Sequence, residues 1–227
     1  MTIQVSNVSC AFGERTVLQA FTATFRAGRI TALTGPSGSG KTTLLNMLGG
    51  LTTPDSGTIE FEGLDIASMN SRARRKFRRS NVGYLFQDYG LVSDLSVMEN
   101  IKIAVPRVSR ETMESALNEV GLGGSEKRTV SELSGGEQQR IALARLILAQ
   151  PKIVLADEPT GALDKANARL VLKHLRHFAQ KGAVVVVATH SAFISNNSDE
   201  VVELRCSGKI QLGSSVTPVL VGCAVVW

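Results

Sequence analysis

The stretch Gly35-Pro36-Ser37-Gly38-Ser39-Gly40-Lys41-Thr42-Thr43 decides how the rest of the chain is organised. It follows the pattern G-x-x-x-x-G-K-[ST] of a phosphate-binding loop. Its three glycines allow the backbone to curl so that consecutive N–H groups point at one anion. Residues 29–34 before it are typical of a buried strand, and residues 43–48 after it of a helix. The loop is therefore predicted to open onto a helix N-terminus, where the helix dipole favours negative charge.

The residue types in this loop predict how a nucleotide and its metal ion would be held. The Lys41 ammonium is expected to meet the β- and γ-phosphates, and the Thr42 hydroxyl is expected to ligate Mg²⁺. The other predicted ATP contacts come from the same loop. They are Gly35, Ser37, Gly38, Ser39, Gly40 and Thr43.

The length and composition indicate a soluble globular protein of one domain, or of one domain with a lobe. The chain has 227 residues, 43% of them hydrophobic, and a net charge of +5, which is too modest to indicate a nucleic-acid partner. Its three cysteines, Cys10, Cys206 and Cys223, lack metal-ligand spacing and fit a reducing compartment. We find no signal-peptide pattern and no apolar run of about 20 residues, the length that a spanning helix needs. We therefore expect a cytosolic chain that contacts a membrane through a partner.

The order of predicted elements indicates an α/β fold. Residues 3–8 and 17–25 alternate apolar and polar side chains, which predicts antiparallel strands. Strands and helices then alternate, which predicts a mostly parallel sheet with helices on both faces. Ligands of such sheets bind at the carboxyl ends of the strands. Gln87, Asp157-Glu158 and His190 all follow predicted strands, as the phosphate-binding loop does.

A second motif lies at Leu133-Ser134-Gly135-Gly136-Glu137-Gln138-Gln139-Arg140, where it leads into a helix predicted through residues 141–149. By itself, Ser-Gly-Gly is only a helix cap followed by permissive glycines. Together with the loop upstream and Asp157-Glu158 downstream, it resembles the signature motif of ABC transporter ATP-binding subunits, with Glu137 at the fifth place of the LSGGQ pattern. The resemblance covers about residues 2–212.

This resemblance implies the fold and its boundaries. The expected architecture is an α/β P-loop NTPase core with a mostly parallel sheet, an N-terminal antiparallel β subdomain and a helical signature subdomain. The ATP-binding domain would span residues 1–212, with the helical subdomain at about residues 88–150. The apolar tail at residues 213–227 falls outside the resemblance.

The resemblance also assigns roles at the strand ends. Asp157 would hold Mg²⁺, and Glu158 would act as the general base that polarises the attacking water. Gln87 corresponds to the glutamine that contacts the metal and water and relays to the membrane partner. His190 corresponds to the histidine near the γ-phosphate, so that Lys41, Gln87, Glu158 and His190 form the predicted catalytic set.

Further implied contacts involve the adenine and a second copy of the chain. Phe12 lies where the family stacks an aromatic ring on adenine. Ser134, Gly135 and Gly136 would close over the γ-phosphate that the other subunit holds, and residues 161–164 would couple the two sites. The resemblance therefore implies a dimer with two ATP molecules at its interface.

The implied function is that of an ATP-hydrolysing motor that drives separate transmembrane permease subunits from the cytoplasmic face of the cell membrane. Residues 81–91 and 97–101 are similar to the exporter group that serves lipoproteins, macrolides, peptides and haem. These remain the candidate cargoes. The alternative is a non-transporting ABC ATPase that regulates a membrane partner, as in cell division. No nucleic-acid partner is expected.

Three further segments carry weaker signals. Residues 88–100 are a hypothetical docking site for the membrane partner. The six basic residues between Arg72 and Arg79 indicate either a solvated helix face or a surface for acidic partners or lipid headgroups. His174 and His177 are spaced as helical metal ligands could be, but without further ligands we interpret both as surface residues.

Overall fold

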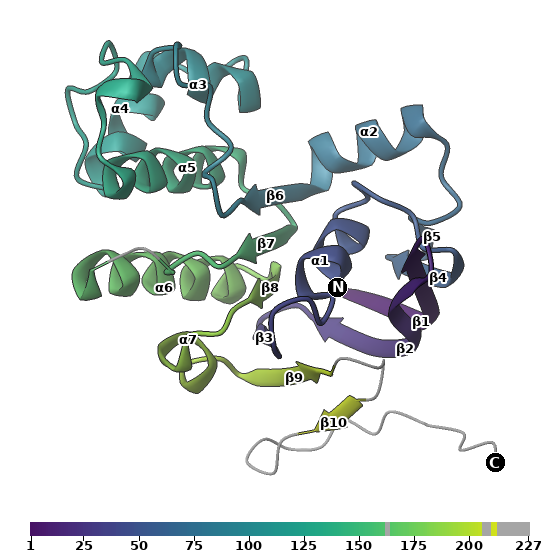
Figure 1. The fold of residues 1–227 in the computed structure, drawn as a ribbon. Coiled ribbons are helices and arrows are strands. Elements are labelled where there is room, and N and C mark those ends of the chain that lie inside the picture. The colour runs from purple at the N-terminus through teal and green to yellow at the C-terminus, as the bar shows by residue number, and fades with distance from the viewer. Residues whose placement is uncertain (162–163, 206–209, 213–227) are drawn as a thin grey trace, which may run out of the picture.

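The computed structural model describes residues 1–161, 164–205 and 210–212. Two β sheets and a group of helices make up the fold (Figure 1). Cys206, Cys223 and the tail at residues 213–227 lie outside the described residues, as do two residues of the 161–164 segment, so our predictions for them have no structural counterpart here.

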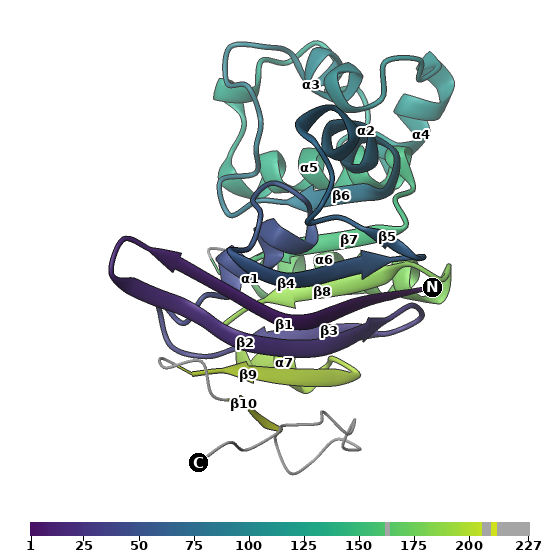
Figure 2. The same ribbon diagram turned by 90° about the vertical axis from the view of Figure 1, so that its right-hand side faces the viewer.

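An antiparallel sheet occupies the N-terminal part of the chain, as predicted. Its strand order is β2-β1-β4-β5. Figure 2 shows β1, β2 and β4 running side by side across the molecule. The strands are β1 (Thr2–Phe12), β2 (Arg15–Arg26), β4 (Ser56–Phe61) and β5 (Leu64–Asp65). Only β5 was not expected, because two residues are too few to show an alternating pattern.

The second sheet has six strands in the order β10-β9-β3-β8-β7-β6. All of its pairs are parallel except β9 with β10, which confirms the prediction of a mostly parallel sheet. The strands are β3 (Ile30–Thr34), β6 (Val82–Leu85), β7 (Ile153–Asp157), β8 (Val184–Ala188), β9 (Glu200–Leu204) and β10 (Ile210–Leu212).

The central strands are mostly apolar because both of their faces are covered. Every residue of β7 and β8 is buried. In β8, Val184 and Val186 pack in the core shared with the antiparallel sheet, whereas Val185 and Val187 pack in the core formed by the helices. Alternate residues of one strand thus join two cores.

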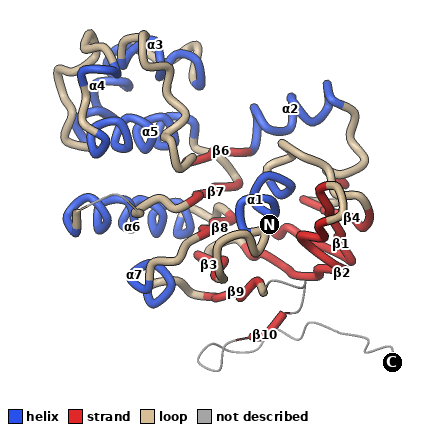
Figure 3. Tube along the Cα trace, in the orientation of Figure 1, coloured by secondary structure: helices blue, strands red, loops and turns tan. Residues whose placement is uncertain are grey.

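The helices are distributed unequally around the parallel sheet. Most lie to its left in Figure 3 and the antiparallel strands lie to its right, with α1 packed between the two sheets. The helices are α1 (Lys41–Leu48), α2 (Ser71–Asn81), α3 (Val97–Ala104), α4 (Arg110–Glu119), α5 (Gly135–Ala149), α6 (Lys165–Gln180) and α7 (Ala192–Asn196), with a 3-10 turn at Val130–Glu132.

One sequence-based expectation about the helices was incomplete and one was wrong. Helix α5 covers the predicted residues 141–149 but begins at Gly135, where Ser134 caps it despite the low helix propensity of two glycines. His174 is only 3% exposed, because its position on α6 places it beside the buried Val171 and Leu175. Only His177 lies on the surface as expected.

Candidate nucleotide-binding site

The loop between β3 and α1 has the backbone conformation that its glycines were expected to permit. Gly35, Gly38 and Gly40 have φ angles of 141°, 77° and 95°. Residues other than glycine rarely adopt these φ angles. A Cβ atom at Gly40 would also lie 2.8 Å from Cγ1 of Val17, and one at Gly35 would overlap the carbonyl of Leu204. The curled loop therefore depends on glycine both for its backbone angles and for close approach.

The N-terminus of α1 presents uncapped donors. Its N-cap is Gly40, in the left-handed region, and its first turn contains no acidic residue. The Ser39 hydroxyl is buried and has no hydrogen-bond partner among the described residues. Lys41 Nζ spans the loop, donating to the carbonyl oxygens of Gly35 at 2.8 Å and Pro36 at 3.1 Å. Free N–H groups, an unpaired hydroxyl and an ammonium together suit an anion such as a nucleotide phosphate.

The phosphate-binding loop and the start of α1 open into a cavity of about 650 Å³. The cavity brings together the β1–β2 hairpin, the phosphate-binding loop and the carboxyl ends of β6, β7 and β8. The predicted residues that line it are Phe12, Gly35, Ser37, Gly38, Gly40, Lys41, Thr42, Thr43, Gln87, Asp157, Glu158 and His190. Ser39 does not line the cavity but is buried within the same loop.

Asp157 ends β7 opposite Ala188 of β8 and is 7% exposed. Burial raises the pKa of Asp157, and the nearby charge of Glu158 raises it further. A hydrogen bond from Thr42 and the charge of Lys41 lower the pKa, but the net shift is upward. The described residues contain no cluster of three or more His, Cys, Asp or Glu side chains that could hold a metal. Magnesium at nucleotide sites usually needs only one or two protein oxygens, with phosphates and waters completing its shell. The adjacent Thr42 and Asp157 oxygens fit that requirement.

Glu158 is held rigidly at the cavity wall. Its φ of 45° is unusual for a non-glycine residue, and its N–H donates to Ala188 O at 2.9 Å. Glu158 Oε1 lies 2.8 Å from Nδ1 of His190, whose side chain is 72% exposed. Glu158 Oε2 accepts at 3.3 Å from both the Thr189 hydroxyl and the His190 N–H. A carboxylate fixed by two hydrogen bonds and by contact with His190 Nδ1, and facing an anion site, is suited to orient water.

The β1–β2 hairpin contributes one predicted residue and one that the sequence analysis missed. The predicted residue is Phe12, which is 61% exposed and ends β1. The missed residue is Arg15. Arg15 begins β2 and lines the same cavity, where its Nη2 donates to Gly38 O at 3.2 Å. Arg15 therefore adds a second positive charge near Lys41. A basic residue three positions after Phe12 in a tight hairpin was the available sequence signal.

The signature residues lie elsewhere in the same copy of the chain. Ser134, Gly135 and Gly136 do not line the cavity, and the first two are exposed. Ser134 is the N-cap of α5 in a reciprocal capping box with Glu137. Glu137 Oε2 accepts from Ser134 N at 2.9 Å and from Ser134 Oγ at 2.8 Å, and Arg128 Nη1 lies 2.9 Å from Glu137 Oε1. These bonds lower the pKa of Glu137 from 4.5 to about 2.

Comparison with known proteins assigns the family. The family model described as "ABC transporter" matches residues 18–161. The chain belongs to the ABC transporter family. An uncharacterized ABC transporter ATP-binding protein of Mycobacterium tuberculosis is 44% identical over 183 residues, covering 78% of this chain and 56% of that protein.

Two named relatives differ greatly in length. The macrolide export ATP-binding/permease protein MacB of Escherichia coli is 38% identical over 92% of this chain and 34% of that protein. The lipoprotein-releasing system ATP-binding protein LolD 1 of Rhodopirellula baltica is 39% identical over 82% of this chain and 84% of that protein. This ABC chain thus spans about half the length of its mycobacterial relative and about a third of MacB.

Solved structures give the same family. The chain matches the dimeric structure of MJ0796, a bacterial ABC transporter cassette, with a TM-score of 0.84 and 28% identity, over 92% of this chain and 96% of that one. A dimeric post-hydrolysis state of MJ0796 bound to ADP and Pi matches with a TM-score of 0.85. These matches confirm the predicted fold class. Within the described part of the ABC chain, no helix has the length and apolar character to cross a bilayer.

Proposed function

We propose that this ABC chain binds ATP with Mg²⁺ in the cavity and hydrolyses it as the motor subunit of an exporter. The observation that carries the proposal is the uncapped N-terminus of α1, which faces Asp157, Glu158 and His190 within one cavity. An anion site beside a metal-binding carboxylate and a fixed second carboxylate has the parts that phosphoryl transfer to water requires.

Each group has a task in that reaction. The loop N–H groups and Lys41 bind the phosphates and offset the charge that develops on the transferred group. Thr42 and Asp157 would hold Mg²⁺, which supplies further positive charge to the phosphate oxygens when bound. Glu158, oriented by His190 and Thr189, accepts the proton of the attacking water. Phe12 offers its exposed ring to the adenine.

A second copy of the chain would complete each site. Ser134 and Gly135 are exposed at a helix N-terminus and lie outside their own cavity, so they are free to meet the nucleotide of another copy. The dimeric state of the MJ0796 cassette supports the same arrangement here. Loss of the γ-phosphate would then remove the contacts that keep two copies closed.

Permease subunits are the proposed membrane partner, and the cytoplasmic face of the membrane is the proposed location. The large apolar side chains Phe86, Val92 and Ile103 are exposed around the segment that follows Gln87. Arg145 of α5 donates to the carbonyl oxygens of Tyr89 and Gly90, both at 2.7 Å, and so ties this segment to the signature helix. A partner docked there could transmit movement of α5. The relatives MacB and LolD support an exporter.

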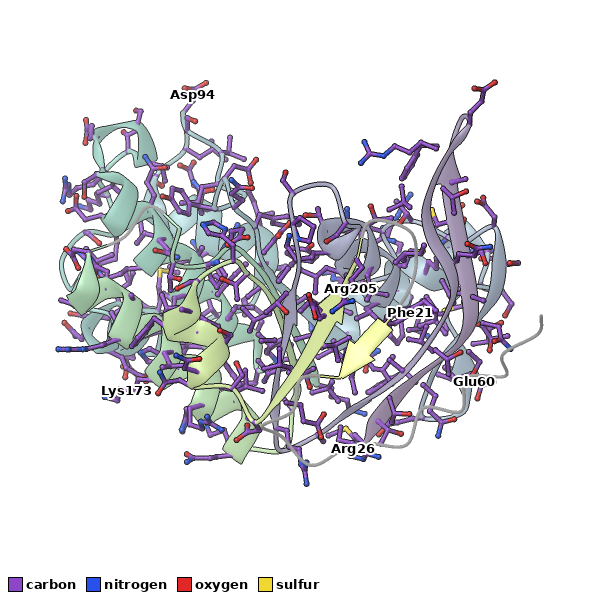
Figure 4. All side chains as sticks on the ribbon, turned by 60° about the horizontal axis from the view of Figure 1, so that its bottom comes forward. Phe21, Arg26, Glu60, Asp94, Lys173 and Arg205 are labelled. Atoms are coloured by element: carbon purple, nitrogen blue, oxygen red, sulfur yellow. The ribbon has the colours of Figure 1, made fainter. Side chains whose placement is uncertain are left out.

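Replacing Glu158 by Gln tests the proposal. The variant keeps the size of the side chain and one acceptor oxygen but cannot take a proton, so hydrolysis should fall by about 10²-fold or more. ATP binding should be retained, measured by equilibrium titration beside phosphate release. Glu60→Gln is the matched control, because Glu60 lies exposed on the antiparallel sheet (Figure 4). Near-normal turnover by Glu158→Gln would exclude Glu158 as the base.

A further inference from the structure

We propose that one exposed face of α2 binds the anionic phospholipid headgroups of the membrane that holds the permease. The proposal rests on the proposed function only for the presence of a membrane partner. Nothing in nucleotide binding or hydrolysis uses α2, because none of its residues lines the cavity.

Four basic residues form this surface. Arg72, Arg75, Lys76 and Arg79 are spaced i, i+3, i+4 and i+7, which places them on one side of a helix. All four are exposed. We call them the basic face of α2. At a rise of 1.5 Å per residue the face extends over about 10 Å, roughly two helical turns.

The opposite side of α2 is fixed to the protein. Phe77 is buried and packs edge-on against Phe61 with ring centroids 5.9 Å apart. Arg78 Nη1 donates to Gly50 O at 2.6 Å, and Asn70 caps the helix N-terminus. The basic face is therefore held outward by packing and hydrogen bonds.

The basic face has no internal counterions in the described part of the chain. No Asp or Glu of residues 1–161 and 164–205 forms an ion pair with a basic residue of α2. The six basic residues of this one helix exceed the net charge of the whole chain, +5. Neighbouring like charges on a helix repel one another, so an external polyanion would stabilise this arrangement.

The position of α2 favours a membrane as that polyanion. Figures 1 and 2 both place α2 at the same end of the molecule as α3, far from β9 and β10. Helix α3 carries the exposed Ile103 of the proposed permease surface. A permease docked at this end would bring the bilayer to the same side of the protein, within reach of α2.

The chemistry of the face favours headgroups over a folded acidic protein. The face presents charge without an exposed apolar side chain, so it suits contact at the headgroup level rather than insertion into the bilayer. Each basic residue near an anionic bilayer increases binding by about fivefold. The attraction should weaken as salt rises, because exposed charges are screened.

Vesicle sedimentation of the full chain without nucleotide tests the proposal. The probes are vesicles of phosphatidylcholine alone and vesicles containing phosphatidylglycerol. The triple variant Arg72→Gln/Arg75→Gln/Arg79→Gln should bind anionic vesicles roughly 100-fold more weakly than the parent chain. The matched control Arg169→Gln/Lys173→Gln/Lys181→Gln removes the same charge from exposed sites on and after α6 (Figure 4 labels Lys173) and should bind like the parent.

The outcomes distinguish lipid binding from general charge attraction and from a protein partner. Salt-sensitive binding to the anionic vesicles that only the α2 variant loses would support the proposal. Equal loss in both variants would show general charge attraction and overturn it. A parent chain that ignores anionic vesicles, while the α2 variant no longer co-purifies with the permease, would also overturn it and assign the face to a protein. Phosphate release by the α2 variant, measured separately, should be normal, so failure of the ATPase proposal would be visible on its own.

Discussion

The N-termini of α1 and α5, both proposed to face a phosphate, show two ways of starting a helix. Helix α1 starts from Gly40, a residue that offers no side-chain cap, and leaves its first donors open to a cavity. Helix α5 starts from Ser134, whose hydroxyl and N–H are both bonded to the Glu137 carboxylate. The N-terminus of α1 therefore has free donors for an external anion, whereas the N-terminus of α5 already binds the carboxylate of its own Glu137.

The two helix starts differ because α1 is held by packing, whereas α5 depends on a side-chain cap. Helix α1 is buried between two sheets, so packing can hold it without a cap. Helix α5 starts at an exposed surface with two glycines, and there the capping box offsets their low helix propensity. The negative charge that stabilises α5 would also repel a phosphate from another copy. Arg128, bonded to Glu137, partly compensates for that charge.

The largest effect should come from removing the cation at α1. Lys41→Ala is expected to raise the ATP dissociation constant of the chain about 10- to 100-fold, because hydrogen bonds to charged groups contribute about 1.5–3 kcal/mol. Fluorescent-nucleotide titration at low protein concentration measures it. Arg128→Ala removes a cation at α5 in the same way, and it should leave the ATP dissociation constant unchanged at low protein concentration. Equal weakening by both variants would show that the two termini do not differ as we infer.

A smaller effect should come from removing the hydroxyl groups at the two termini. Ser134→Ala should lower the free energy of unfolding by about 1 kcal/mol, since an N-cap bond is lost. Ser39→Ala should lower it little or not at all, because the buried Ser39 hydroxyl has no partner among the described residues. Urea denaturation without nucleotide measures both. If Ser39→Ala proves the more destabilising, α1 depends on a bond that we have not identified.

The sequence predicted one of these termini better than the other. The α1 loop is a local pattern, so its glycines, Lys41 and the strand before it could be recognised directly. At α5 the resemblance drew attention to Ser134 and the glycines, but Ser-x-x-Glu is also the pattern of a capping box. That pattern also indicates a partner for Glu137, which the sequence analysis did not recognise when it interpreted Ser134 as a helix cap.

Residues that act through tertiary contacts were beyond such patterns. Arg15 reaches Gly38 only because the β1–β2 hairpin folds over the loop, 23 residues away in sequence. His174 is buried because other helices cover its side of α6, which helical spacing alone does not show. The strand ends were predictable as a group, since the parallel topology fixes them at one edge.

The smallest effect should appear in the pH dependence of stability. Because its capping bonds lower the pKa of Glu137 from 4.5 to about 2, its charged form stabilises the fold at neutral pH. That contribution is complete above pH 4.5 and is lost as the pH falls from there toward about 2. Glu137→Gln should therefore be less stable than the parent at pH 7, and the gap between their melting temperatures should narrow on acidification.

Helix α4 offers the control for this measurement. Glu111 also lies in a helix first turn, but its N-cap Ser109 accepts from Thr112 N, and Ser109 Oγ lies 2.8 Å from Thr112 Oγ1. Glu111→Gln therefore removes a carboxylate without breaking a capping box. The difference between its melting temperature and that of the parent should not narrow as the pH falls. A Glu137→Gln gap that stays constant from pH 7 to about 3 would mean that the carboxylate is not what stabilises α5. The charge of Glu137 would then act only through its ion pair with Arg128, at the surface where a second copy is proposed to bind.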